Sequence, residues 1–218
     1  VEVYMNTRSY DAALKSIDRI AKPSAQILEA KQKILFQLGT QSFANADFEQ
    51  ALKYLNQSIA IGQYNRQTKA DAYYWCGESY YRLNRMVEAA RDFNAYLQLT
   101  TQPNNEMYAL ANYNLGYIAF HRKDYTQASN YFQKYIQLEK GENTTALADA
   151  YNRIGDCHLH VRNFEEAKHY YSQAEQRNTP SGDYSFYQLA LVSGLQKDYT
   201  GKITLLLSLI HISASTRP

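Results

Sequence analysis

The sequence predicts an all-α fold in which pairs of helices repeat along the chain and stack into an α-solenoid. Three observations predict it. The 218 residues include only 9 glycines and 4 prolines, which argues against a turn-rich β protein. Short segments that end in alanine recur at a nearly constant interval, and a glycine precedes four of the alanines by a fixed distance. Such internal repetition is typical of proteins whose units bury their apolar faces against their neighbours.

Three positions define the repeat. The alanines are separated by 38, 38, 39 and 39 residues, and a sixth copy follows after 35 with lysine in that position. A glycine lies 12 residues before four of these positions, and a large apolar residue lies 4 residues after every one. The alanine positions are Ala13, Ala51, Ala89, Ala128, Ala167 and Lys202. The glycine positions are Gly39, Gly77, Gly116 and Gly155, with Ala190 in the last copy. The apolar positions are Ile17, Leu55, Phe93, Phe132, Tyr171 and Leu206.

Each repeat is predicted to form two helices. One first helix carries the i, i+3, i+4, i+7 spacing of a single buried face, in Tyr73, Cys76, Gly77 and Tyr80. We expect the glycine to lie where the two helices of a pair approach closely, because it has no side chain. The second helices are expected to start with capping boxes, in Asp47 with Gln50, Asp124 with Gln127, and Asn163 with Glu166.

This pattern of an aromatic residue, an apolar residue, glycine and tyrosine, followed by alanine and phenylalanine, resembles the tetratricopeptide repeat family. The best copy runs from Tyr73 to Tyr80 and continues to Ala89 and Phe93. The period departs from the family's roughly 34 residues, which implies longer connections or an extra helical turn. Trp75 falls two residues after the family's tryptophan position, and the closing proline is displaced or missing. The longer period is similar to that of bacterial envelope members, including outer-membrane assembly lipoproteins.

The resemblance implies a right-handed α-solenoid and a fragment of a longer, bacterial protein. The expected segments are the second helix of a truncated repeat (1–22), full repeats (32–65, 70–103, 109–142 and 148–179) and a partial repeat (183–205). Residues 206–218 break the pattern and resemble the translation of a sequencing adapter, so we expect a non-native tail there. The apolar run from 203 to 212 is shorter than the roughly 20 residues that a membrane span needs.

In this family the first helices line the concave side of the solenoid, so the helix face opposite the core is the predicted partner-binding groove. Its residues are Phe36, Asp71, Tyr74, Glu78, Arg82, Tyr113, Tyr117, His121, Asn152 and Asp156. Tyrosine supplies a large, stiff contact surface with a polar tip, and the acids add negative charge. We therefore expect a groove for an extended or helical peptide with apolar groups and some positive charge. The alternative, packing against the adjacent repeat, is favoured for Phe43, Tyr81 and Phe120.

Several function classes are disfavoured. The net charge is +2 without a lysine or arginine run, which argues against nucleic acid as a partner. His158 and His160 lie two residues apart, so on a helix they point about 200° apart and do not share a zinc site. Cys76 is expected to be a buried, inert thiol that is too distant from Cys157 for a disulfide. We expect no enzyme activity, cofactor or metal.

The leading functional interpretation is a protein- or peptide-binding scaffold or adaptor. One alternative is a regulatory region of a larger enzyme or signalling protein whose active domain lies outside this sequence. Another is a structural spacer or oligomerisation array. The resemblance favours the bacterial periplasm or outer membrane, with the cytoplasm as the alternative, and the partner's identity is not predicted.

Overall fold

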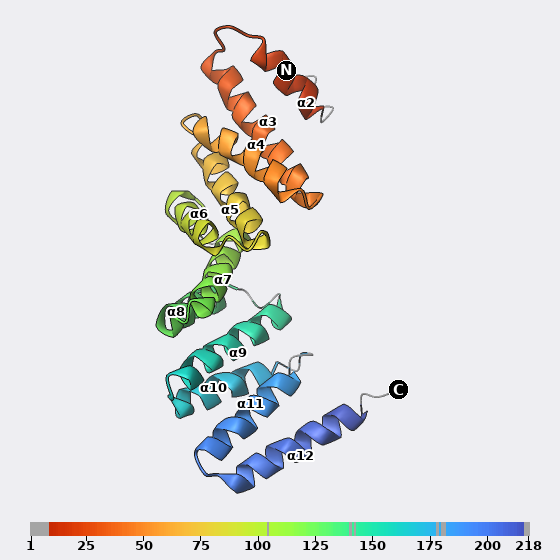
Figure 1. Cartoon of the computed structure of the whole chain (residues 1–218), viewed down its shortest axis with the longest axis vertical. Helices are drawn as coiled ribbons and strands as arrows, with labels where there is room; N and C mark the ends of the chain where they lie inside the picture. Colours follow the sequence, from red (N-terminus) through yellow and green to blue (C-terminus); the bar gives the residue numbers. More distant parts are fainter. Residues whose placement is uncertain are drawn as a thin grey trace. The chain divides into compact units, whose positions relative to one another are not determined.

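The computed structural model describes residues 9–103, 105–139, 141, 143–177, 179 and 182–215, with only the helical backbone described at 211–215. Residues 1–8 of the predicted half repeat and 216–218 of the predicted tail lie outside the described residues. The described part contains eleven α-helices and no strand, which confirms the all-α prediction (Figure 1). Its fold is that of a helical-repeat solenoid.

The helices follow one another in pairs. The helix that precedes the first full pair is α2 (Tyr10–Asp18). The first helices of the pairs are α3 (Ala25–Ala44), α5 (Arg66–Arg82), α7 (Glu106–His121), α9 (Thr144–His160) and α11 (Gly182–Leu195). The second helices are α4 (Phe48–Ala60), α6 (Met86–Leu99), α8 (Tyr125–Leu138), α10 (Phe164–Glu175) and α12 (Tyr199–Ser215). The chain divides into two compact units, Val1–Ala111 and Asn112–Pro218, here called unit 1 and unit 2.

The repeated glycines lie where the two helices of a pair approach most closely, as predicted. A Cβ atom at Gly77 would lie 2.8 Å from Cδ1 of Phe93, and one at Gly155 would lie 2.6 Å from Cε1 of Tyr171. Gly39 and Gly116 meet Leu55 and Phe132 in the same way. Each glycine of the repeat therefore seats the large apolar residue that follows the repeated alanine, which explains why the two positions recur together.

The first helices are long and begin ahead of the predicted repeat boundaries. Helix α5 begins at Arg66 and helix α9 at Thr144, where the predicted repeats start at 70 and 148. Asparagine side chains cap both starts: Asn65 accepts a hydrogen bond from the Thr68 amide at 2.9 Å, and Asn143 accepts one from Ala146 at 3.0 Å. Of the two explanations for the long period, the structure thus supports an extra helical turn.

Of each predicted capping box, the hydrogen bond to the N-cap side chain forms in two of three cases, whereas the Asp47 and Asp124 amides donate to the carbonyl oxygens of Ser42 and Ala119. Asp47 accepts a hydrogen bond from the Gln50 amide at 3.1 Å, and Asp124 accepts one from Gln127 at the same distance. Asn163 occupies the N-cap position of α10, but its side chain makes no capping hydrogen bond, so that part of the prediction is wrong. Asparagine is as good an N-cap residue as aspartate, so its identity alone does not show whether the bond forms.

This difference predicts unequal effects of two matched substitutions. Asp47→Ala should lower the free energy of unfolding by about 1 kcal/mol, because the Gln50 amide loses its partner at the helix start. Asn163→Ala should cost less than about 0.5 kcal/mol, since no side-chain cap is lost there. Urea denaturation followed by circular dichroism measures both values. Equal losses at the two positions would contradict the assigned capping bonds.

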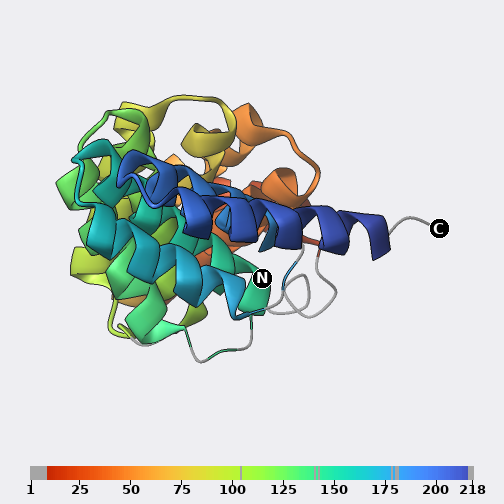
Figure 2. The ribbon, with the colours of Figure 1, turned by 90° about the horizontal axis from the view of Figure 1, so that it is seen from below.

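Helix α12 crosses the boundary of the predicted tail without interruption. It runs beside α11 and continues to Ser215 (Figures 1 and 2). Leu205 packs against a buried cluster of Ala167, Tyr171, Leu189 and Val192. Leu207 and Ile210 are more than half exposed, at 52% and 60%. The non-native origin of residues 206–218 stays a prediction.

Candidate functional site

In unit 1 the predicted groove face lies on α3 and α5. Phe36, Asp71 and Glu78 are half-buried there, and Arg82 is exposed. The Asp71 carboxylate accepts a hydrogen bond from Nε2 of Gln67 at 2.7 Å, while its burial raises the pKa of that carboxyl. Because this donor is a neutral amide, the hydrogen bond leaves the negative charge of Asp71 in place.

Tyr74 is a correction to the predicted groove, because it belongs to the core. Only 4% of Tyr74 is exposed, and its ring packs edge-on against Phe93 and Tyr96 at centroid distances of 5.8 and 5.4 Å. Burial and the neighbouring Glu78 raise the pKa of its hydroxyl. Helix α5 contacts α3, α4 and α6, so its buried surface is wider than the single face assumed from the spacing.

In unit 2 the two predicted groove tyrosines share one carboxylate. Tyr113 and Tyr117, both half-buried on α7, each donate a hydroxyl hydrogen bond to Oδ2 of Asp149 on α9; that from Tyr113 measures 2.7 Å. Nε of Arg153 lies 3.5 Å from Oδ1 of the same carboxylate. The two rings also contact each other edge-on at 5.2 Å. These tyrosines are therefore held in fixed orientations at the surface between α7 and α9.

A second carboxylate extends this network into the interior. Asp156 is 5% exposed, and its Oδ2 lies 2.7 Å from Nη1 of Arg153. Its Oδ1 accepts hydrogen bonds from the hydroxyls of Tyr171 on α10 and Tyr184 on α11, each at 2.7 Å. Burial raises the pKa of Asp156 despite these partners, and burial together with Asp156 raises the pKa of Tyr184 to about 12.

Asn152 and Asp156 are thus further corrections, since both lie inside the chain and tie α9 to α10 and α11. Asn152 is 1% exposed and accepts a hydrogen bond from the Ser185 hydroxyl at 2.8 Å. His121 is exposed. For the groove residues that are at least partly accessible, binding of a partner stays a prediction. The network of Asp149, Arg153 and Asp156 escaped sequence analysis because Arg153 gave no motif of its own.

Two aromatic residues pack against the adjacent repeat, as favoured from the sequence. The Phe43 ring on α3 meets Trp75 on α5 at a centroid distance of 4.9 Å. The Phe120 ring on α7 meets His160 on α9 at 5.9 Å. These contacts join successive first helices within a unit, which makes Phe43 and Phe120 structural residues.

The two cysteines are buried, and the two histidines next to Cys157 stack on tyrosine rings. Cys76 and Cys157 are free and buried, and burial raises the pKa of both thiols, that of Cys157 to about 12. His158 stacks on Tyr170, while His160 stacks on Tyr125. Within the described residues, no group of three or more acidic, histidine or cysteine side chains could hold a metal ion. No helix among those described has both the length and the apolar character that a bilayer span requires.

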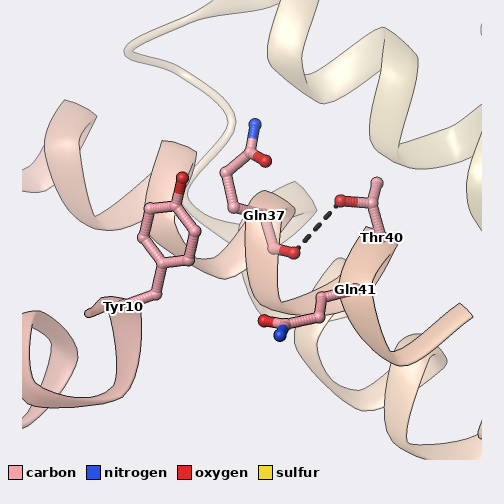
Figure 3. Close-up of a pocket in the computed structure, with 4 residues that line it drawn as sticks. All are labelled: Tyr10, Gln37, Thr40 and Gln41. Carbon is pink, nitrogen blue, oxygen red and sulfur yellow. Dashed lines mark hydrogen bonds between the residues drawn. The ribbon is translucent and has the colours of Figure 1, made fainter. Parts of the chain in front are cut away.

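One surface cavity was not anticipated from the sequence. It has a volume of about 640 Å³ and lies between α2 and α3 in unit 1. Figure 3 shows Tyr10 on one side and Gln37, Thr40 and Gln41 on the other, with the Thr40 hydroxyl donating to the Gln37 carbonyl oxygen at 3.1 Å. The cavity is lined by amide and hydroxyl groups, and only the packing of α2 on α3 brings them together.

Comparison with known proteins places this geometry in a family. Two family models, both described as tetratricopeptide repeat, match residues 36–106 and 106–179. No curated protein sequence matches the chain significantly.

Several solved structures resemble the fold at low sequence identity. MamA 41-end from Desulfovibrio magneticus RS-1 aligns with 86% of this chain and 98% of its own, at a TM-score of 0.69 and 17% identity. YrrB, described as a TPR protein with an unusual peptide-binding site, aligns with 84% of this chain and 87% of its own. Its TM-score is 0.69 and its sequence identity is 17%. BtubC (BKLC) from P. vanneervenii aligns with 97% of this chain and 92% of its own, at a TM-score of 0.67 and 17% sequence identity. At these identities the likeness shows the fold.

Proposed function

Because the chain belongs to the tetratricopeptide repeat family, we propose that it is a scaffold or adaptor that binds a peptide segment of a partner protein on its first-helix face. Proteins of this family generally act as non-catalytic interaction scaffolds. YrrB, a structural neighbour, is described as a TPR protein with an unusual peptide-binding site. The envelope location inferred from the long repeat stays a prediction.

The observation that carries this proposal is the accessible acidic surface of α5. Asp71 and Glu78 lie seven residues apart, two turns along one helix face, and both are half-buried. Asp71 accepts a hydrogen bond from the Gln67 amide, and Glu78 contributes to the raised pKa of the Tyr74 hydroxyl. Two carboxylates on one helix face favour a partner that presents lysine or arginine.

Unit 2 offers a different surface to the same kind of partner. Arg153 contacts both Asp149 and Asp156, which reduces the negative charge that this part of the face presents. Tyr113 and Tyr117 are fixed by Asp149, so little side-chain entropy remains to be lost when a ligand packs on them. We therefore expect Asp71 and Glu78 to supply charged contacts in unit 1, and Tyr113 and Tyr117 to supply apolar contacts in unit 2, each unit being considered by itself.

The experiment selects random nine-residue peptides displayed on phage against the whole chain, then measures the affinity of the selected peptides. For basic, apolar-containing peptides, Asp71→Asn/Glu78→Gln should weaken binding about tenfold or more, with helicity unchanged. The difference in affinity between the native chain and this double variant should become smaller at high salt, because exposed charge pairs are screened. The matched control is Asp11→Asn/Glu49→Gln, which removes two exposed acids elsewhere in unit 1. Equal weakening in both double variants would reject the assigned surface.

A further inference from the structure

A second groove lies in unit 2, among α8, α9 and α10. Its main cavity has a volume of about 490 Å³, and an adjoining cavity of about 200 Å³ continues it along α8. Gln133 lines both cavities, and we refer to the two together as the groove. The residues that carry the argument are Gln133 and Gln137 on α8, Tyr151 on α9, and Tyr170 and Gln173 on α10. Two walls of this groove are second helices, so it is distinct from the first-helix face.

The lining combines amide groups with aromatic rings. Among the described residues that line the two cavities there is no aspartate, glutamate or lysine. The Gln137 and Gln173 side chains make no hydrogen bond to other described residues, so their donors and acceptors remain open to a ligand. Tyr151 and Tyr170 supply aromatic rings to the lining, and the Arg177 guanidinium lies over the Tyr151 ring at 4.1 Å. The groove therefore offers paired donors and acceptors with a positive edge.

The repeat itself shows why the groove forms at this place. Gln133 lies five residues after its repeated alanine, and the corresponding residues in α4 and α6 are Asn56 and Asn94. Both asparagines fold back onto their own helices: each Nδ2 donates to the carbonyl oxygen of Leu52 or Ala90, at 2.8 and 2.7 Å. Gln133 is one methylene longer, and its Nε2 reaches across to the Tyr170 hydroxyl at 3.1 Å. This contact joins α8 to α10 and defines the groove between them.

The spacing of the amides suits an extended polypeptide. Gln133 and Gln137 are four residues apart, which is about 6 Å along a helix axis. In an extended chain, peptide groups on the same side repeat every two residues, or roughly 6.6 Å. A side-chain amide has both a donor and an acceptor, so it can pair with a backbone peptide group whatever the sequence of the ligand.

We propose that this groove binds an extended peptide segment through its backbone, with an acidic side chain of the peptide directed to Arg177. The Gln133 side-chain oxygen and the Gln137 amide pair with successive peptide groups on one side of the ligand, and the Gln173 amide pairs with a further one. Tyr151 packs against the peptide's apolar atoms. The charge preference is opposite to that of the Asp71 and Glu78 surface, where a basic peptide is expected. A single chain thus carries two peptide sites of different selectivity.

The test uses random nine-residue peptides displayed on phage and selected on the whole chain in the presence of excess basic peptide. Selected peptides are then titrated by fluorescence anisotropy against the native chain and Gln137→Ala/Gln173→Ala. We expect acidic peptides whose affinity falls about tenfold or more in this double variant, since each amide hydrogen bond is lost. Both glutamines lack internal hydrogen-bond partners among the described residues, so the fold should be retained.

Two controls separate this site from the first-helix face. Gln98→Ala removes the exposed glutamine at the position of α6 that corresponds to Gln137, and it should leave affinity unchanged. Asp71→Asn/Glu78→Gln should also leave the binding of these peptides unchanged. If no acidic peptide is selected, or if every selected peptide binds Gln137→Ala/Gln173→Ala as tightly as the native chain, the groove is not a peptide site. That result leaves the proposed first-helix site standing.

Discussion

Asp156→Ala is expected to lower the free energy of unfolding by about 3 kcal/mol or more. The substitution removes the acceptor of the Tyr171 and Tyr184 hydroxyls and the ion-pair partner of Arg153. Taking one member from a buried pair is costly because the remaining charge and donors stay desolvated. Asp156 holds three helices of unit 2 together, so the loss concerns the contacts of α9 with both α10 and α11.

Two further variants define the origin of this loss. Asp156→Asn keeps an oxygen that can accept from both tyrosines but removes the charge, so it should cost less than Asp156→Ala. Asp183→Ala removes an exposed acid at the start of α11 and should change stability by about 0.5 kcal/mol or less. Urea denaturation followed by circular dichroism and tyrosine fluorescence measures all three. A loss in Asp156→Ala no larger than that in Asp183→Ala would show that the network does not stabilise the chain.

The repeat predicted which residues meet inside a helix pair better than it predicted which residues remain accessible. The spacing of glycine, alanine and apolar residue predicted the close approach, and Gly77 does seat Phe93. The same spacing placed Tyr74 on an open face, whereas α5 packs against α3, α4 and α6 and buries that side chain. A helical period identifies one buried face, but a helix inside a solenoid has neighbours on several sides.

Contacts between successive repeats were hidden for a related reason. Tyr113 and Asp149 are 36 residues apart, close to one repeat, so the period alone could have suggested that they are neighbours. It gave no reason to pair a tyrosine with that particular acid. Gln133 stands where two other repeats have asparagine, and the sequence does not show what this difference does. Its effect depends on whether the side-chain amide bonds to Tyr170 or to its own helix. Such differences become visible only once the side chains are placed.

The turns between the paired helices show a further limit of sequence patterns. Ala46, Asn84, Lys123, Arg162 and Lys197 all have positive φ angles, between 59° and 66°. Glycine is the usual residue at such a position after a helix, because a side chain is strained there. The chain forms the turn at five equivalent places without glycine, so a search for glycine stop signals misses each one. Backbone hydrogen bonds across the turn offset the strain of the positive φ angle: the Asp47 amide, next to Ala46, donates to the Ser42 carbonyl oxygen at 2.9 Å.

Phe93→Ala should be about as destabilising as Asp156→Ala, for a packing reason. The Phe93 side chain is fully buried, and its ring fills the space that Gly77 leaves and contacts the Tyr74 ring. Truncation of such a residue costs about 3 to 5 kcal/mol, from lost apolar burial and from the cavity left behind. Val87→Ala on the same helix is the control, because Val87 is 73% exposed and its truncation should cost little.

A double-mutant cycle tests whether Gly77 and Phe93 act as one contact. Gly77→Ala alone should cost about 1 to 3 kcal/mol, because the new methyl group would lie 2.8 Å from the Phe93 ring. In the Phe93→Ala background the clash is absent and the methyl group fills part of the cavity, so Gly77→Ala should be neutral or stabilising. Additive losses would mean that the glycine is needed for another reason.

The helices that are destabilised by Phe93→Ala show whether the chain unfolds repeat by repeat or as a single cooperative core. In a solenoid each repeat contacts mainly its neighbours, so opening should be local. Hydrogen exchange of the Phe93→Ala variant should show faster exchange of amides in α5 and α6, with those of α9 and α10 close to their native rates. If exchange instead rises equally in all four helices, the chain unfolds as one unit, and neither Phe93→Ala nor Asp156→Ala then reports on its own repeat alone.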